Sequence, residues 1–318
     1  MTSAASPSST HGTWTGIACG AAAGALWGLV FLAPELAHGF TPLQLTVGRF
    51  LAYGLFAAAL VLPRWRRLAA QLGRQDWATL LRLALLGNTL YYVLLANAVQ
   101  RGGIAMTSLV IGFLPVAVTV IGSRAQGAVP LRRLLPSLLF GVAGIGCIGW
   151  QSLGAGGAAS PLGLLCAVGA LAAWTAYAVG NARALARLPQ VSVQDWNLAT
   201  GVATGAQALL LLPFALLLDD RAHAGADWLR LAGVAVGVAL AASIVGNALW
   251  NRMSRLLPLT MVGQMILFET LFALLYGFAW ERRGPTPAEL LAMACVAASV
   301  LSCVHAHRPA PSRYAAAA

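Results

Sequence analysis

The sequence predicts an all-α membrane protein whose ten transmembrane helices form two inverted five-helix repeats. Hydrophobic residues make up 59% of the 318 residues and charged residues only 9%, whereas soluble domains carry about 25% charged residues. The chain contains ten apolar segments, each long enough for a spanning helix of about 20 residues. They divide into two sets of five, and an odd number of spans per set gives the two sets opposite orientations in a bilayer.

The same composition argues against a soluble enzyme, a nucleic-acid-binding protein and a disordered chain. Ten helices would use about 200 residues, which leaves no room for a large soluble domain. The formal net charge of +11 comes from arginine, because the chain contains 20 basic residues and none of them is lysine. In a membrane protein such an excess orients the chain rather than binding nucleic acid.

The predicted helices follow from the hydropathy in chain order. Residues 1–12 are polar and lack the basic start of a signal peptide, so we expect this region to be retained. Acidic, proline-bearing or glycine-bearing breaks then separate apolar segments that do not alternate as barrel strands would. The ten predicted spans cover residues 14–33, 41–62, 78–98, 104–123, 134–152, 161–182, 196–218, 228–250, 258–280 and 286–304.

The distribution of arginine between alternate loops predicts the orientation. One side carries 13 of them: Arg64, Arg66, Arg67, Arg74, Arg124, Arg132, Arg133, Arg183, Arg187, Arg252, Arg255, Arg308 and Arg313. The other side carries four, namely Arg101, Arg221, Arg282 and Arg283. Basic residues gather on the cytoplasmic side, so both termini are expected in the cytoplasm. Seven tryptophans at span ends are expected to form an interfacial belt: Trp14, Trp65, Trp77, Trp150, Trp196, Trp228 and Trp280.

A glycine-rich linker, residues 154–160, divides the chain into predicted domains of residues 14–152 and 161–305. The first span of each domain carries a central tryptophan, Trp27 and Trp174. Residues 97–101 and 251–255 also match, with asparagine and arginine in phase. These similarities support an inverted-topology repeat.

Several short motifs recur in a characteristic order. They are Trp27-Gly28, Pro42 followed by Arg49-Phe50, Ala98 onward to Pro115-Val116, Ala172-Ala173-Trp174, Leu249-Trp250-Asn251-Arg252 through Leu257-Pro258, Glu269, and Glu281 before Pro285-Thr286. Over residues 14–305 this order resembles the EamA-type transporters of the drug/metabolite transporter superfamily. That family usually has Glu-Pro in the ninth span, where this chain has Glu269-Thr270. The variant is similar to the branch that exports aromatic amino acids and some cationic drugs.

The resemblance implies two five-helix bundles around a central cavity lined by spans 1, 3, 4, 6, 8 and 9, with spans 5 and 10 at the periphery. It implies a secondary transporter of a bacterial inner membrane that exports aromatic amino acids, or organic cations such as viologens, by alternating access. The expected partners are the lipid bilayer and this small solute; neither nucleic acid, nor a cofactor, nor a second subunit is expected. Other amino acids, drugs and nucleosides are alternative solutes within the same superfamily.

Arg49 and Glu269 are the ionisable residues deep within the predicted spans, where charge is costly unless it is paired or hydrated. Arg82 lies near enough to a span end to extend to the interface. Glu269 is interpreted as a coupling site, as an anchor for an ammonium group, or as a buried carboxylate that ties helices together. Arg49 either holds a substrate carboxylate or braces its neighbours, and a direct Arg49–Glu269 pair is left open.

Aromatic and amide residues within the spans are the candidate substrate-binding residues. Aromatic faces attract organic cations and stack on rings, and amides bind ammonium or carboxylate groups without a charge of their own. The alternative for each residue is helix packing. The candidates are Trp27, Asn88, Tyr91, Tyr92, Trp174, Tyr177, Asn247, Trp250, Gln264 and Tyr276.

Four further residues are candidate gate or hinge positions. Pro115, midway along the fourth predicted span, is expected to kink that helix, and Asn181 and Asn251 lie near the predicted cytoplasmic face. Gly28 belongs to a stripe that allows close helix packing, either as a fixed contact or as a sliding surface. The stripe consists of Gly16, Gly20, Gly24 and Gly28.

Motifs that the sequence lacks narrow the mechanism further. It has no Gly-x-x-x-x-Gly-Lys loop, which excludes ATP-driven pumping by this chain alone. Because Glu269 is the one acid deep within the predicted spans, a relay of several carboxylates is also excluded. The five cysteines lie in apolar runs without a Cys-x-x-Cys pair, which favours buried side chains over a metal site. A membrane-embedded lipid enzyme and a non-transporting receptor are the alternatives of another class.

Overall fold

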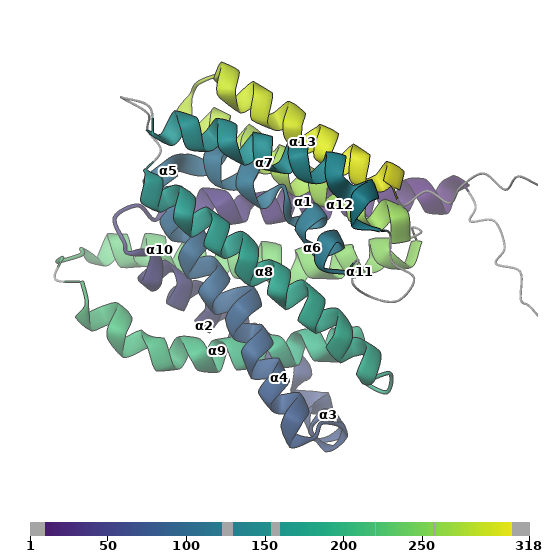
Figure 1. Cartoon of the computed structure of the whole chain (residues 1–318). Coiled ribbons are helices and arrows are strands. Elements are labelled where there is room, and N and C mark those ends of the chain that lie inside the picture. The colour runs from purple at the N-terminus through teal and green to yellow at the C-terminus, as the bar shows by residue number, and fades with distance from the viewer. Residues whose placement is uncertain (1–9, 123–129, 154–159, 220, 257–258, 307–318) are drawn as a thin grey trace, which may run out of the picture.

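The computed structural model describes residues 10–122, 130–153, 160–219, 221–256 and 259–306, which form helices and the turns that join them. Helices from the two halves, residues 14–152 and 161–305, interleave in one bundle (Figure 1). Within the described residues, six helical stretches are long and apolar enough to cross a membrane. The prediction of an all-helical membrane protein is confirmed, whereas the number of crossings and the inverted repeat stay predictions.

Within the described residues each predicted span is mainly helical, although the fourth is interrupted by a turn at Gly112 and Phe113. The N-terminal half comprises α1 (Thr10–Leu36), α2 (Pro42–Val61), η1 (Leu62–Arg64), α3 (Trp65–Gln71), α4 (Arg74–Ala84), η2 (Leu85–Thr89), α5 (Leu90–Ile111), α6 (Leu114–Gly122) and α7 (Leu131–Leu153). The C-terminal half comprises α8 (Pro161–Arg187), α9 (Val193–Leu217), α10 (Gly225–Val238), η3 (Ala239–Gly246), α11 (Asn247–Leu256), α12 (Leu259–Glu281) and α13 (Pro287–Ala306).

Side-chain caps fix where several helices begin. At the start of α2, the Thr41 hydroxyl accepts the Gln44 N–H at 3.2 Å, and Gln44 Oε1 accepts the Thr41 N–H at 2.9 Å. This reciprocal arrangement satisfies two N–H groups that have no partner within the helix. The carboxylates of Asp76 and Asp227 accept the N–H of the third preceding residue at 3.0 and 3.1 Å. Helices α4 and α10, which begin the third and eighth predicted spans, therefore start in the same way.

Both halves carry π-helical turns directly after these helices. The segments are η2 and η3, and such turns are rare and frequent at functional sites. A Cβ atom on Gly87 of η2 would lie 2.4 Å from the Tyr177 ring of α8. In η3, the Ala242 carbonyl accepts a hydrogen bond of 3.0 Å from Trp27 Nε1 of α1. The first helix of each half thus packs on the π-helical segment of the other half.

The third and fourth predicted spans meet at a glycine. Helix α5 is interrupted at Gly103, whose φ of +81° lies in the left-handed region that glycine adopts most readily. A turn over Gly112 and Phe113 then separates α5 from α6. Pro115 is the second residue of α6, so the prediction that it kinks a continuous helix is wrong. Proline is tolerated there because N–H groups of a first turn have no helical partner.

Small residues bring helices of opposite halves into close contact. Cβ atoms on Gly24 and Gly28 of α1 would lie 2.6 and 3.0 Å from atoms of α12, so the predicted glycine stripe is a packing surface. On α2, a Cβ atom at Gly54 would lie 2.5 Å from the Cα atom of Gly205 in α9. At these points the two helix backbones approach each other without intervening side chains.

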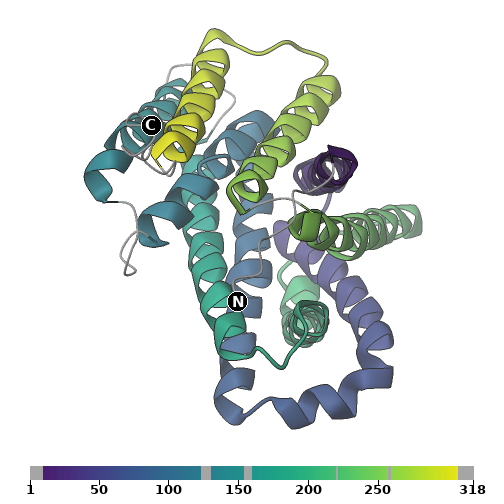
Figure 2. The same ribbon diagram turned by 90° about the vertical axis from the view of Figure 1, so that its right-hand side faces the viewer.

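Helices α7 and α13 lie side by side at one edge of the bundle (Figures 1 and 2). Two buried serines join them: Ser137 Oγ donates to the Ser299 carbonyl, and Ser299 Oγ donates to the Ser137 carbonyl, both at 2.7 Å. The outer faces of both helices expose large apolar side chains, such as Leu139 and Leu301. This arrangement fits the expectation that the fifth and tenth spans are peripheral.

The tryptophans at span ends do not form one class. Trp14 and Trp150 are 67% and 82% exposed, as residues of an interfacial belt would be. Trp196 is fully buried, and its Nε1 donates to Asn181 Oδ1 at 2.7 Å. The prediction that Trp196 faces the interface is therefore wrong, because its indole N–H has a partner inside the C-terminal half.

Candidate functional site

Arg49 lies where helices of both halves meet. It is eight residues into α2 and only 8% exposed, and its Nη2 donates to Ser243 Oγ of η3 at 3.5 Å. Its guanidinium carbon lies 4.1 Å from the centre of the Tyr92 ring of α5 and 5.1 Å from that of Phe50. These ring faces attract the cation. The main surroundings of this buried charge are therefore aromatic.

The hydrogen bonding of this group is incomplete. Arg49 Nε and the Tyr92 hydroxyl are both buried, and no hydrogen bond of acceptable geometry reaches either atom. The one hydrogen bond of the guanidinium, to Ser243, is at the long limit of the usual range. Buried polar groups are normally satisfied by protein or water. The site is therefore prepared to receive at least one hydrogen-bond acceptor.

Glu269 lies on α12, near the arginine but not bonded to it. Both residues are described, and no ion pair within 4 Å joins them, so the open question of a direct pair is answered for this structure. The Arg49 charge still acts on Glu269, and Glu269 acts on Tyr91 of α5. A basic side chain of α2 and an acidic side chain of α12 are thus close enough to influence each other.

An aromatic pair lies beside these charges. The rings of Trp27 and Trp250 are 4.9 Å apart between centroids and tilted by 35°. Trp27 is held by its hydrogen bond to Ala242, and Ala242 directly precedes Ser243, the partner of Arg49. One turn of η3 therefore connects the tryptophan pair to the arginine.

Tyr53 connects this group to the second set of predicted aromatic residues. It lies four residues after Arg49 on α2, is near Tyr177, and donates its hydroxyl to the Asn197 carbonyl at 3.1 Å. Tyr177 in turn meets Trp174 edge-to-face, with centroids 5.6 Å apart. Tyr53 was not among the predicted site residues, although a spacing of four residues on one helix places it on the same face as Arg49.

Three predicted binding residues are engaged in helix packing. Asn88 Nδ2 donates to Thr204 Oγ1 of α9 at 2.9 Å, and Asn247 Nδ2, at the start of α11, donates to the carbonyl of Ser243 in the preceding segment η3 at 2.9 Å. The Tyr276 hydroxyl donates to the Ala25 carbonyl of α1 at 3.2 Å. These bonds match the packing alternative. Contact with a solute stays a prediction for them.

The candidate gate residues differ in what the structure shows of them. Asn181 is bonded to Trp196, and Gly28 contacts α12. The side chains of Asn251 and Gln264 lie outside the described side chains. Two surface hollows of about 410 and 260 Å³ lie elsewhere, between α7 and α13 and between α2, α9 and α10. Neither is lined by Trp27, Arg49 or Glu269.

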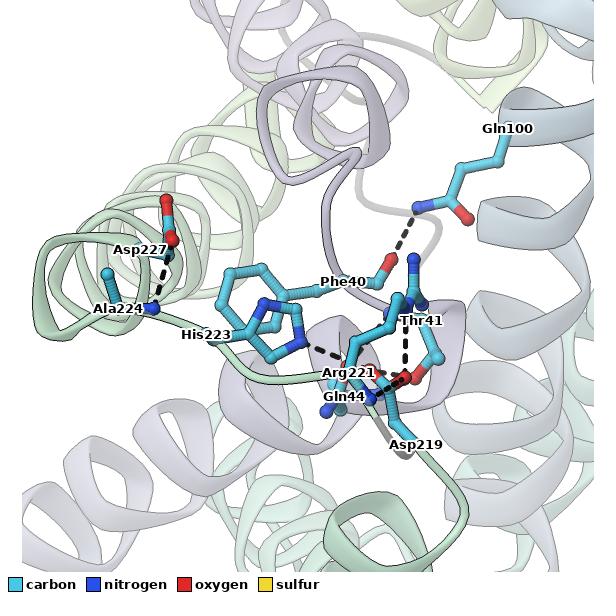
Figure 3. Close-up of polar contacts among 9 residues, drawn as sticks. All are labelled: Phe40, Thr41, Gln44, Gln100, Asp219, Arg221, His223, Ala224 and Asp227. Atoms are coloured by element: carbon cyan, nitrogen blue, oxygen red, sulfur yellow. Dashed lines mark hydrogen bonds and ion pairs between the residues drawn. The ribbon is translucent and has the colours of Figure 1, made fainter.

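At one end of the bundle, loops from the two halves are joined by His223 (Figure 3). Its ring stacks on Phe40 with centroids 4.1 Å apart and meets Trp228 edge-on at 5.6 Å. Its Nε2 lies 3.1 Å from Asp219 Oδ2, while Gln100 Nε2 donates to the Phe40 carbonyl at 3.1 Å. These contacts hold the α9–α10 loop against the α1–α2 loop.

We expect Asp219 to stabilise this loop in a pH-dependent manner. Its hydrogen bond from Arg221, at 2.8 Å, lowers the pKa of Asp219 to about 2, below the value of an unfolded chain. A lowered folded-state pKa stabilises the fold above the unfolded value, and this contribution disappears as the pH falls through the folded value. Asp219→Asn should therefore lower the melting temperature at pH 6 and have little effect near pH 2. A difference from the wild type that is the same at both pH values would contradict this assignment.

The family follows from a sequence comparison. The chain matches the model of the EamA-like transporter family over residues 14–150 and again over residues 161–304. The chain belongs to the EamA-like transporter family. The predicted family is confirmed, and the protein is a membrane transporter rather than an enzyme. The two family matches fall on the two halves of the chain.

Individual relatives support the family but name no solute. The chain is 32% identical over 313 residues to Inner membrane protein YtfF of Escherichia coli (strain K12), covering 92% of this chain and 94% of that protein. It is 27% identical over 190 residues to Uncharacterized transporter YvbV of Bacillus subtilis (strain 168), 59% of each chain. A solved structure titled "Crystal structure of protein" shares the fold, with a TM-score of 0.60 and 20% identity over 94% of this chain and 99% of that one. The aromatic amino acid branch therefore stays a prediction.

Proposed function

We propose that this EamA-like transporter exports aromatic amino acids, and organic cations with an aromatic body, from the cytoplasm by alternating access. The observation that carries the proposal is the grouping of the Trp27–Trp250 ring pair with the opposite charges of Arg49 and Glu269. Aromatic rings stack on aromatic solutes, and buried charges of both signs suit a solute that is charged or zwitterionic. YtfF is named as an inner membrane protein, which supports the same location here.

The packing of the helices supports two inverted five-helix repeats, residues 14–152 and 161–305. The most extensive contacts pair α1 with α12, α2 with α9, α5 with α8, and α7 with α13, so each joins the two halves. The packing of α1 on η3 corresponds to the packing of α8 on η2. Such a correspondence is expected if a two-fold axis relates the repeats. Sites of such transporters lie between the repeats. A monomer is sufficient, because one chain supplies both repeats.

The ends of the bundle support ten spans with both termini in the cytoplasm. The α1–α2 and α9–α10 loops are joined at one end by Phe40 and His223, and the Arg101 carbonyl accepts the Ser160 N–H at 3.0 Å. Arg64 pairs with Asp195 at 3.1 Å between other connections. The loops that meet at each end are thus alternate loops of the chain. The arginine excess was counted over the same alternate loops.

A counterflow panel tests the proposal. Purified protein in proteoliposomes loaded with unlabelled tryptophan should take up labelled Trp, Phe or Tyr faster than protein-free vesicles. A panel that also contains aliphatic amino acids and organic cations establishes the solute class. Absence of flux for every compound of a broad amino-acid and cation panel would refute export of these solutes.

A matched pair of variants gives the panel its specificity control. Trp27→Ala removes a ring from the proposed site and should reduce the flux of aromatic solutes more than that of aliphatic ones. Trp150→Ala removes a ring that is 82% exposed on the outer face of α7, so its flux should match the wild type. Equal losses for aromatic and aliphatic solutes in Trp27→Ala would mean damage to packing instead.

A further inference from the structure

We propose that Arg49, Tyr92 and Ser243 bind the carboxylate of the solute, while Glu269 binds its ammonium group, so that the transporter selects zwitterions over amines. The inference rests on the proposed function and makes it narrower. It separates aromatic amino acids, which carry both charges, from organic cations, which lack the carboxylate.

Arg49 has more hydrogen-bond donors than the protein satisfies. A guanidinium carries five N–H donors in a planar fork that matches a carboxylate. Here one donor makes a bond of 3.5 Å to Ser243, and Nε has no partner. The Tyr92 hydroxyl, on a residue that is fully buried, lies close to Arg49 but makes no hydrogen bond of acceptable geometry. A carboxylate in this place would accept bonds from both residues at once.

Glu269 supplies the opposite charge at a distance. Arg49 and Glu269 attract each other, yet no ion pair within 4 Å joins them. Two unpaired opposite charges in a medium of low dielectric are costly. An α-amino acid presents a carboxylate and an ammonium group on one carbon and can pair with both residues. An amine would pair with Glu269 alone and would leave the hydrogen-bond donors of Arg49 without an acceptor.

The position of η3 places the ring of such a solute as well. Consecutive residues of η3 contact the two recognition elements, since Ala242 accepts from Trp27 and Ser243 accepts from Arg49. We therefore expect the side chain of a solute held at Arg49 to extend toward the Trp27–Trp250 pair. Because Arg49 is 8% exposed and Tyr92 is buried, a solute reaches them when the two halves separate, as alternating access requires.

The test compares solutes that differ in one charged group. L-Tryptophan, tryptamine (without carboxylate) and indole-3-propionate (without ammonium) compete for counterflow by the full-length protein in proteoliposomes. The wild type should prefer tryptophan to tryptamine. In Arg49→Gln, competition by tryptophan and by indole-3-propionate should weaken on the order of 10- to 100-fold, the size of a lost charged hydrogen bond. Competition by tryptamine should stay unchanged. In Glu269→Gln, competition by tryptophan and by tryptamine should weaken, whereas competition by indole-3-propionate should stay unchanged.

Two further variants keep the test valid if Arg49→Gln folds poorly. Tyr92→Phe removes one hydroxyl and keeps the ring over Arg49. It should therefore weaken competition by the two compounds that carry a carboxylate, tryptophan and indole-3-propionate, and not competition by tryptamine. Arg82→Gln removes an exposed charge on α4 and should leave the relative competition of the three compounds unchanged. Equal losses for tryptophan and tryptamine in Arg49→Gln and Tyr92→Phe, or a wild type that prefers tryptamine, would overturn carboxylate recognition while export still stands. Absence of flux for all three solutes would overturn both proposals.

Discussion

Gly54→Val is expected to destabilise the protein by about 3 kcal/mol, near the upper end of the usual cost of overpacking. A Cβ atom at this position would lie 2.5 Å from the Cα atom of Gly205 and 3.2 Å from its nitrogen. Both are backbone atoms of α9, so no flexible side chain can move aside. The helices α2 and α9 would have to separate, although they make the most extensive contact between the halves. Denaturant or thermal unfolding in detergent measures the effect.

Gly233→Val provides the matched control. Gly233 lies on α10, and a Cβ atom there would meet no atom within 4 Å. The same change of residue in another helix of the bundle should therefore shift the melting temperature little. If Gly54→Val and Gly233→Val had the same melting temperature, the close approach of α2 to α9 would be wrong.

The contrast between these two glycines shows how far the sequence determines the packing. Gly20, Gly24 and Gly28 repeat at a spacing of four on one helix, and the predicted packing face is confirmed against α12 and Met253. Gly54 belongs to no such stripe. Its contact depends on how α2 and α9 are aligned, and one sequence carries no information on this alignment. Helix positions were predictable because about 20 apolar residues in succession have few alternatives.

The candidate site shows the same division. Arg49 and Glu269 were found by their depth in apolar segments, which one sequence reveals directly. Ser243 was not found, because a serine in an apolar helix acquires a role only through a partner on another helix. Trp196 was predicted wrongly for a related reason. A tryptophan near a helix end suits a lipid interface or a buried amide, and only the fold brings Asn181 within 2.7 Å.

The largest effect on activity is expected for Glu269→Gln. If one proton is exchanged per solute, proteoliposomes with a lumen one pH unit more acidic should accumulate labelled tryptophan about tenfold, since one unit of pH corresponds to about 1.4 kcal/mol. Glu269→Gln should abolish this accumulation, because a glutamine has no proton to exchange. Counterflow of indole-3-propionate without a pH gradient should persist, which shows that the variant is folded and mobile. Both measurements use one preparation of vesicles.

Glu281→Gln is the control on the same helix. Glu281 ends α12, where it pairs with Arg283, and its loss should leave the tenfold accumulation intact. The expected mechanism is competition: a proton and a solute ammonium group cannot both occupy the carboxylate of Glu269, so binding of one favours release of the other. Exchange then follows without a relay of further acids. Accumulation that survives in Glu269→Gln would assign the proton step to another group or leave a passive facilitator.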